Sequence, residues 1–219
     1  MNKIFTVSAF LAFIMAPSQP VFAEGTVSEK NWYGRLGVGF AKQINDYDEV
    51  NYGRTEWDFV DGPNFTVSAG YDGKLWALEG EVVYRTMDMD VRVSKGSGTR
   101  LKYKGDQSHL ALMLNSYFHP RSDWIISPYL GLGIGITKIS WNNIIRCTGS
   151  RFYIDDSDNV FTYQLIVGGS YKITPQLFLE ADYRYYVPDD AEITESRGSV
   201  GKFTNQELNV FGLAIKYKF

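Results

Sequence analysis

The sequence predicts an all-β fold, namely an eight-stranded antiparallel up-and-down transmembrane β-barrel with short periplasmic turns and long extracellular loops. Two observations predict this fold. Apolar and polar residues alternate with a period of two in eight separate segments of the 219-residue chain. Short turns and long polar connections alternate between these segments. Beyond the first 23 residues, no apolar run reaches the roughly 20 residues of a membrane helix. A barrel needs no such run, because half of each of its strands is polar.

The N-terminal residues 1–23 predict a secretory signal peptide. Lys3 gives a positively charged start, residues 4–16 are almost all apolar, and cleavage is expected after Ala23. The barrel domain then occupies residues 24–219. A membrane-anchoring helix is the alternative, but the apolar run is shorter than the roughly 20 residues that span a bilayer.

The first four predicted strands each carry an apolar stripe on one face, and they occupy residues 32–40, 63–71, 75–85 and 107–118. In the third strand, Leu78 and Val82 alternate with Glu79 and Glu81. A tight hairpin turn is predicted at residues 72–74, because the Asp-Gly pair there accepts the positive φ that such turns need.

The last four predicted strands follow the same pattern, at residues 125–140, 160–171, 177–187 and 204–219. In the fifth strand, Gly131, Gly133 and Gly135 lie opposite a leucine and isoleucine stripe and point inward. These glycines either leave room for water or a small ligand, or accommodate bulky neighbours and sheet curvature.

The connections between strands alternate in length. The short ones are at residues 72–74, 119–124 and 172–176, and the long polar ones are at 41–62, 86–106, 140–159 and 188–203. In the second long connection Val91 and Val93 still alternate with polar residues, so that hairpin is expected to continue above the membrane. A soluble β-sandwich is the alternative fold, but apolar stripes on all eight strands exceed what its core requires.

The last predicted strand has an apolar or aromatic residue at every second position, namely Phe211, Leu213, Ile215, Tyr217 and Phe219. This pattern resembles the terminal signal by which outer-membrane barrels are recognised for assembly. The barrel assembly machinery is therefore an expected partner. The alternative is an ordinary last strand of a soluble protein.

The mature chain as a whole resembles the small eight-stranded outer-membrane barrels of the opacity-antigen and OmpA-barrel type. Its strand motifs at residues 37–40, 129–135 and 181–185 carry the resemblance. The resemblance implies a place in the bacterial outer membrane of a Gram-negative bacterium. It also implies a surface-antigen type of role and a charged barrel interior.

An eight-stranded barrel encloses an interior just wide enough for side chains. Four acids and four bases are predicted to point into it: Arg35, Glu79, Glu81, Glu180, Asp182, Arg184, Lys216 and Lys218. Charges in so narrow a space must pair, since an isolated buried ion costs several kcal/mol. Barrel closure is expected to bring Lys216 toward Glu180 and Arg35 toward the carboxylates. The sequence thus predicts a salt-bridged plug, with an ion pathway lined by these residues as the alternative.

The sequence predicts no enzyme, and no catalytic, cofactor or metal residues are proposed from it. A lipid-modifying site needs a nucleophile or base near the outer leaflet. His119 lies in a predicted periplasmic turn, while His109 points inward and its neighbour Ser108 points to the other face. One cysteine, Cys147, and two histidines are too few for a typical zinc site.

The remaining functional signal lies in the long loops. Their charges suit contact with outer-membrane lipid and lipopolysaccharide, or with a host or envelope ligand. A net charge of −3 argues against a nucleic-acid partner. The prediction is a structural or surface-interaction protein of adhesin or antigen type. A small or gated porin-like channel is the first alternative, and a lipid A-modifying enzyme is the second.

Overall fold

The computed structural model describes residues 31–50, 53–73, 75–94, 100–101, 103–120, 124–146, 156–194 and 200–219. The predicted signal peptide and Cys147 lie outside these residues. No helix in the described part of the chain is both long and apolar enough to cross a membrane.

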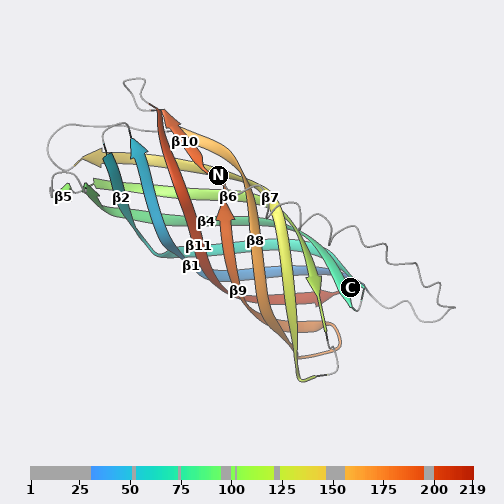
Figure 1. Cartoon of the computed structure of the whole chain (residues 1–219). Coiled ribbons are helices and arrows are strands. Elements are labelled where there is room, and N and C mark those ends of the chain that lie inside the picture. Colours follow the sequence, from blue (N-terminus) through green and yellow to red (C-terminus); the bar gives the residue numbers. More distant parts are fainter. Residues whose placement is uncertain are drawn as a thin grey trace.

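Within the described residues, eleven strands make up a single sheet (Figure 1). They are β1 (Trp32–Val50), β2 (Gly53–Val60), β3 (Gly62–Gly73), β4 (Trp76–Ser94), β5 (Arg100–Leu101), β6 (Tyr103–Phe118), β7 (Ile126–Arg146), β8 (Asp156–Lys172), β9 (Leu177–Pro188), β10 (Ala191–Thr194) and β11 (Val200–Lys218).

Eight of these strands close into a ring in which every neighbouring pair is antiparallel. The order around the ring is β1, β3, β4, β6, β7, β8, β9, β11 and back to β1. The closing pair β1–β11 runs from Tyr33 opposite Lys218 to Asp48 opposite Phe203. Closure pairs the backbone of every strand on both sides, as a membrane-spanning sheet requires. The predicted eight-stranded antiparallel barrel is confirmed.

One end of the barrel carries long strand extensions, and we call it the hairpin end. The connection 41–62, predicted as a loop, instead continues the wall: β1 runs on to Val50, and β2 pairs with β1 and β4. β10 similarly pairs with β11. Alternation detects a strand only where one face is continuously apolar. It therefore missed these strands, which lie in polar connections. The predicted continuation of the second hairpin is confirmed, since Arg92 pairs with Leu101.

The opposite end carries the short connections, and we call it the short-turn end. The turn predicted at residues 72–74 is misplaced: Asp72 pairs with Ala77 and Gly73 with Trp76, so the strand ladder continues through the Asp-Gly pair. Asp72 therefore points into the barrel and is buried. The pleat of β3 has overridden the local turn preference.

The outer face of the barrel is an apolar band. On β1, exposed apolar side chains run from Trp32 to Phe40, and the next outward residue is the exposed Lys42. A run of about nine residues matches the length of a tilted strand that crosses a bilayer. Along β3 the burial alternates at every position. The predicted assignment of apolar side chains to the outer face therefore holds.

The interior is filled by side chains. One buried apolar cluster lies toward the hairpin end and consists of Ala41, Val83, Met87, Ala111, Met113, Tyr186, Leu208 and Val210. A second lies toward the short-turn end and consists of Tyr33, Ala77, Tyr117, Tyr129 and Ile166. A Cβ added to Gly131 would lie 2.7 Å from Tyr117 Cδ1. Of the two alternatives for the glycines of β7, the accommodation of bulky neighbours is therefore the one realised at Gly131.

Candidate functional site

The candidate site is a network of buried charges that lies across the lumen. The structure places seven predicted residues inside the barrel and buries all of them: Arg35, Glu79, Glu81, Glu180, Asp182, Arg184 and Lys216. They come from β1, β4, β9 and β11, at positions two residues apart within each strand, so the pleat points them all inward.

Arg35 on β1 is the centre of this network. Its Nε donates to Glu180 Oε2 at 2.8 Å, and its Nη2 donates to Asp182. Its Nη1 lies 3.7 Å from Glu81 Oε1. One planar guanidinium thus contacts carboxylates of β9 and β4, on two different parts of the barrel wall, and holds them together across the lumen.

Arg184 on β9 forms the second bridge. Its Nη1 donates to Glu81 Oε2 at 2.7 Å, and its Nε donates to Asp182 Oδ1 at 3.1 Å. Glu81 and Asp182 are therefore shared by two arginines. Each charge in such a network neutralises a buried neighbour. Removal of one member therefore leaves a buried charge short of a partner.

Lys216 and Lys218 on β11 complete the pairing at the short-turn end. Lys216 Nζ lies 2.8 Å from Glu180 Oε1 and 4.9 Å from the centre of the Tyr33 ring. Lys218, which is partly exposed, lies 2.8 Å from Asp72 Oδ2. Sequence reasoning missed Asp72 as a lumenal residue because it assigned that residue to a turn.

Glu79 on β4 is held differently from the other carboxylates. Within the described residues no cation lies at ion-pair distance from it. Instead it accepts hydrogen bonds from Tyr117 Oη at 2.8 Å, Tyr33 Oη at 3.1 Å and Asn115 Nδ2 at 3.3 Å. Asn115 also donates to Glu81 at 2.8 Å. Asn115 thus links Glu79 to Glu81, and through Glu81 to the arginines.

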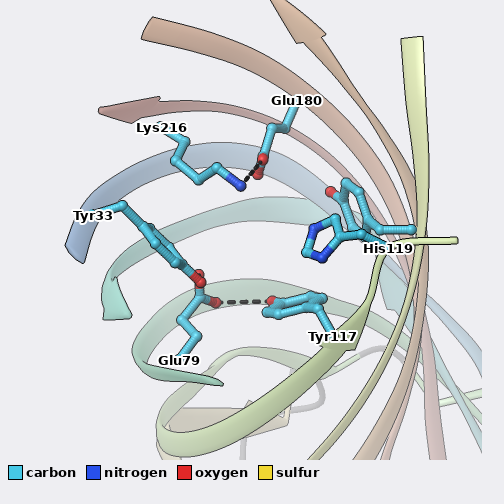
Figure 2. A pocket seen from close by; sticks show the side chains of 7 residues that line it. Tyr33, Glu79, Tyr117, His119, Glu180 and Lys216 are labelled. Carbon is cyan, nitrogen blue, oxygen red and sulfur yellow. Dashed lines mark hydrogen bonds and ion pairs between the residues drawn. The ribbon is translucent and has the colours of Figure 1, made fainter. Parts of the chain in front are cut away.

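A small cavity lies between the network and the short-turn end (Figure 2). It is lined by Tyr33, Glu79, Tyr117, His119, Tyr129, Glu180 and Lys216. Its volume is about 200 Å³ including the open mouth, and its enclosed part holds on the order of one water molecule. Figure 2 shows the Lys216 ammonium beside the Glu180 carboxylate on one side, and Tyr117 bonded to Glu79 on the other.

His119 lies outside the strands, directly after β6, and lines this cavity. Its ring centre is 5.9 Å from that of Tyr129. Partial burial lowers the pKa of His119, and the nearby Lys216 ammonium lowers it further. The sequence prediction placed His119 at the periplasmic end but gave it no part in the lumen.

Several polar lumenal residues had the same inward phase but were not singled out from the sequence: Tyr33, Arg85, Asn115, Tyr117 and Gln164. Alternation with Glu79 and Glu81 marks Arg85 as inward, and alternation with Arg35 marks Tyr33. His109 points inward as expected and is buried. The five residues predicted as an assembly signal all lie exposed on the outer face: Phe211, Leu213, Ile215 and Tyr217 on β11, and Phe219 directly after it.

Comparisons with known proteins agree with this architecture. A family model described as "Outer membrane protein beta-barrel domain" matches residues 7–219. The outer membrane protein PagN of Salmonella typhimurium is 23% identical over 135 residues, which are 58% of this chain and 56% of PagN. The match thus spans little more than half the length of that relative.

Two solved structures show the same fold at low sequence identity. The outer membrane protein OprG from Pseudomonas aeruginosa has a TM-score of 0.59 and 15% identity, over 86% of this chain and 96% of OprG. Neisserial surface protein A has a TM-score of 0.52 and 17% identity, over 86% of this chain and 97% of its own.

Proposed function

The chain belongs to the outer membrane protein β-barrel family, and on this basis we propose that it is a closed surface protein with a structural or surface-interaction role. In this proposal the short turns face the periplasm. The hairpin end projects outside the cell and supplies the surface for a host or envelope ligand. The lumen serves as a rigid plug and not as a transport path.

The observation that carries the proposal is the set of contacts made by Arg35. Its guanidinium contacts Glu81, Glu180 and Asp182 from within the lumen, and Arg184 adds two further ion pairs. An eight-stranded barrel has little interior space to spare. Ions could therefore pass only if these pairs separated, which would leave buried charges unpaired.

The outer face supports lipopolysaccharide as a neighbour. Lys42 follows Phe40 on the outward side of β1, and Lys138 follows Ile136 on the outward side of β7. Both lysines are exposed just beyond the apolar band, where lipid head groups lie. The outward apolar row of β11 suits recognition by the barrel assembly machinery.

A non-enzymatic role is supported by the two histidines. His109 is 1% exposed and points into the lumen, away from lipid. His119 lies at the short-turn end, far along the barrel from the outer leaflet. An enzyme that acts on lipid A would alter the lipid A of cells that express the protein. Because we propose a non-enzymatic role, mass spectrometry of that lipid should show no change.

A small pore is the second candidate, favoured by the cavity that enters the lumen from the short-turn end. Single-channel recording of the purified protein in planar bilayers separates the two functions. A closed plug predicts no discrete openings from the wild type. Reproducible openings that change in Arg35→Met, but not in the outward control Lys138→Met, would establish the pore and reject the plug.

A further inference from the structure

The half of the lumen nearer the hairpin end contains a buried cation that the network does not reach. Arg85 on β4 is 1% exposed, and its Nε and Nη1 have no hydrogen-bond partner. Within the described part of the chain no carboxylate lies at ion-pair distance from it. Its guanidinium carbon lies 3.8 Å from the centre of the Tyr186 ring, so an aromatic face covers one side of the cation.

His109 on β6 lies directly across the strand ladder from Arg85. Both side chains point inward from neighbouring strands, so their Cβ atoms are about 5 Å apart. His109 is also 1% exposed, and neither ring nitrogen has a partner. On the other side of Arg85, Asn64 of β3 stands in the same row, is buried, and has an unpartnered Oδ1.

Three buried polar side chains with unmet hydrogen bonds therefore stand side by side on β3, β4 and β6. Native proteins rarely leave such groups unsatisfied, because each costs on the order of 1–3 kcal/mol. Arginine cannot escape the cost by losing its proton. Its neighbours along β4, Val83 and Met87, belong to the apolar cluster and supply no charge.

We propose that Arg85 and His109 bind a small inorganic anion, such as chloride, within the lumen. The anion accepts hydrogen bonds from the unpartnered N–H groups of Arg85 and from one ring N–H of His109. It supplies the negative charge that no described side chain supplies here. Val83, Met87 and Tyr186 of the buried apolar cluster lie beside Arg85, so a small ion suits this position better than a large one.

The test is the urea unfolding midpoint of the purified protein in detergent micelles, with chloride replacing gluconate at constant ionic strength. Gluconate, a six-carbon organic anion, is much larger than chloride and serves as the comparison salt. A ligand that binds the folded state alone raises its stability with concentration. The wild-type midpoint should therefore rise with chloride and then saturate. Equal midpoints in the two salts would overturn the proposal.

Two variants locate the effect. Arg85→Met should lose the chloride dependence, whereas Lys138→Met, which removes an outward lysine and the same charge, should keep it. His109→Ala should raise the half-saturating chloride concentration by roughly tenfold, as expected for one lost hydrogen bond to an ion. This variant also serves if Arg85→Met does not fold. A chloride response unchanged in both lumenal variants would place the bound ion elsewhere and reject this site.

Discussion

In the half of the lumen nearer the short turns, buried charges are distributed over shared partners, whereas in the half nearer the hairpins one buried cation stands apart. Arg35 and Arg184 share Glu81 and Asp182. Arg85 lies four residues beyond Glu81 on the same strand and contacts the ring of Tyr186. The same residue type is thus embedded in ion pairs in one half and lies among apolar and neutral groups in the other.

This difference separates two effects of a buried charge. Removal of one member of a buried ion pair destabilises the fold, because the other charge is then left unpaired. An unpaired buried charge costs desolvation free energy, and only a ligand of opposite charge can offset that cost. Substitution of arginine should therefore lower stability in the half nearer the short turns, and should be nearly neutral or stabilising in the other half when no anion is bound.

The largest effect is expected for Arg35→Met. The change leaves Glu180 and Asp182 with fewer partners in a buried site, so it should lower the free energy of unfolding by about 3–5 kcal/mol. Urea unfolding in detergent micelles measures this loss. Arg35→Lys keeps the charge but not the planar fork, and should fall between wild type and Arg35→Met. A loss under about 1 kcal/mol for Arg35→Met would show that the network does not hold the barrel together.

Tyr117→Phe should have the next largest effect. It removes the 2.8 Å hydrogen bond to Glu79, a carboxylate held by neutral donors. The expected loss of stability is about 1–3 kcal/mol, the usual cost of leaving a buried acceptor short of a donor. Tyr84→Phe, on the lipid-facing side of β4, is the control. In a Glu79→Gln background the loss should shrink, since the acceptor is then uncharged.

The sequence predicted the faces of the barrel well because alternation reports directly on lipid contact. Alternation gives Glu79, Glu81, Arg35 and Arg184 an inward phase, and all four are buried. It could not say which carboxylate Arg184 meets, because that depends on the stagger between strands. Alternation within a strand is unaffected by that stagger.

The other departures have local causes. Asp72 was assigned to a turn because an Asp-Gly pair is a strong hairpin signal, yet the ladder continues past it. Arg85 is the last residue of a predicted strand. At that position, alternation does not distinguish an inward strand residue from a loop residue. Its lack of a partner is a property of the whole row across β3, β4 and β6, and no single strand reveals it.

Arg85→Met in chloride-free gluconate should change stability little, within about 1 kcal/mol of wild type, or should increase it. The substitution removes an unpaired buried charge and retains an apolar side chain that can pack in the same space. Loss of the contact with Tyr186 offsets part of the gain. The same urea titration measures it. A loss as large as that of Arg35→Met would mean that Arg85 has a protein partner as strong as those in the network.

The smallest effect is expected at the mouth of the cavity, from the titration of His119. Burial and Lys216 lower its folded-state pKa, although Asp72 and Glu180 act in the opposite direction. The unfolded chain, with a histidine pKa of about 6.5, then binds a proton more readily than the folded barrel. The stability contribution is complete above that pH and declines as the pH falls toward the folded pKa. His119→Gln should flatten the stability profile between about pH 7 and pH 5.5, above the range in which ordinary carboxylates titrate. Parallel wild-type and variant profiles would show that His119 keeps an ordinary pKa.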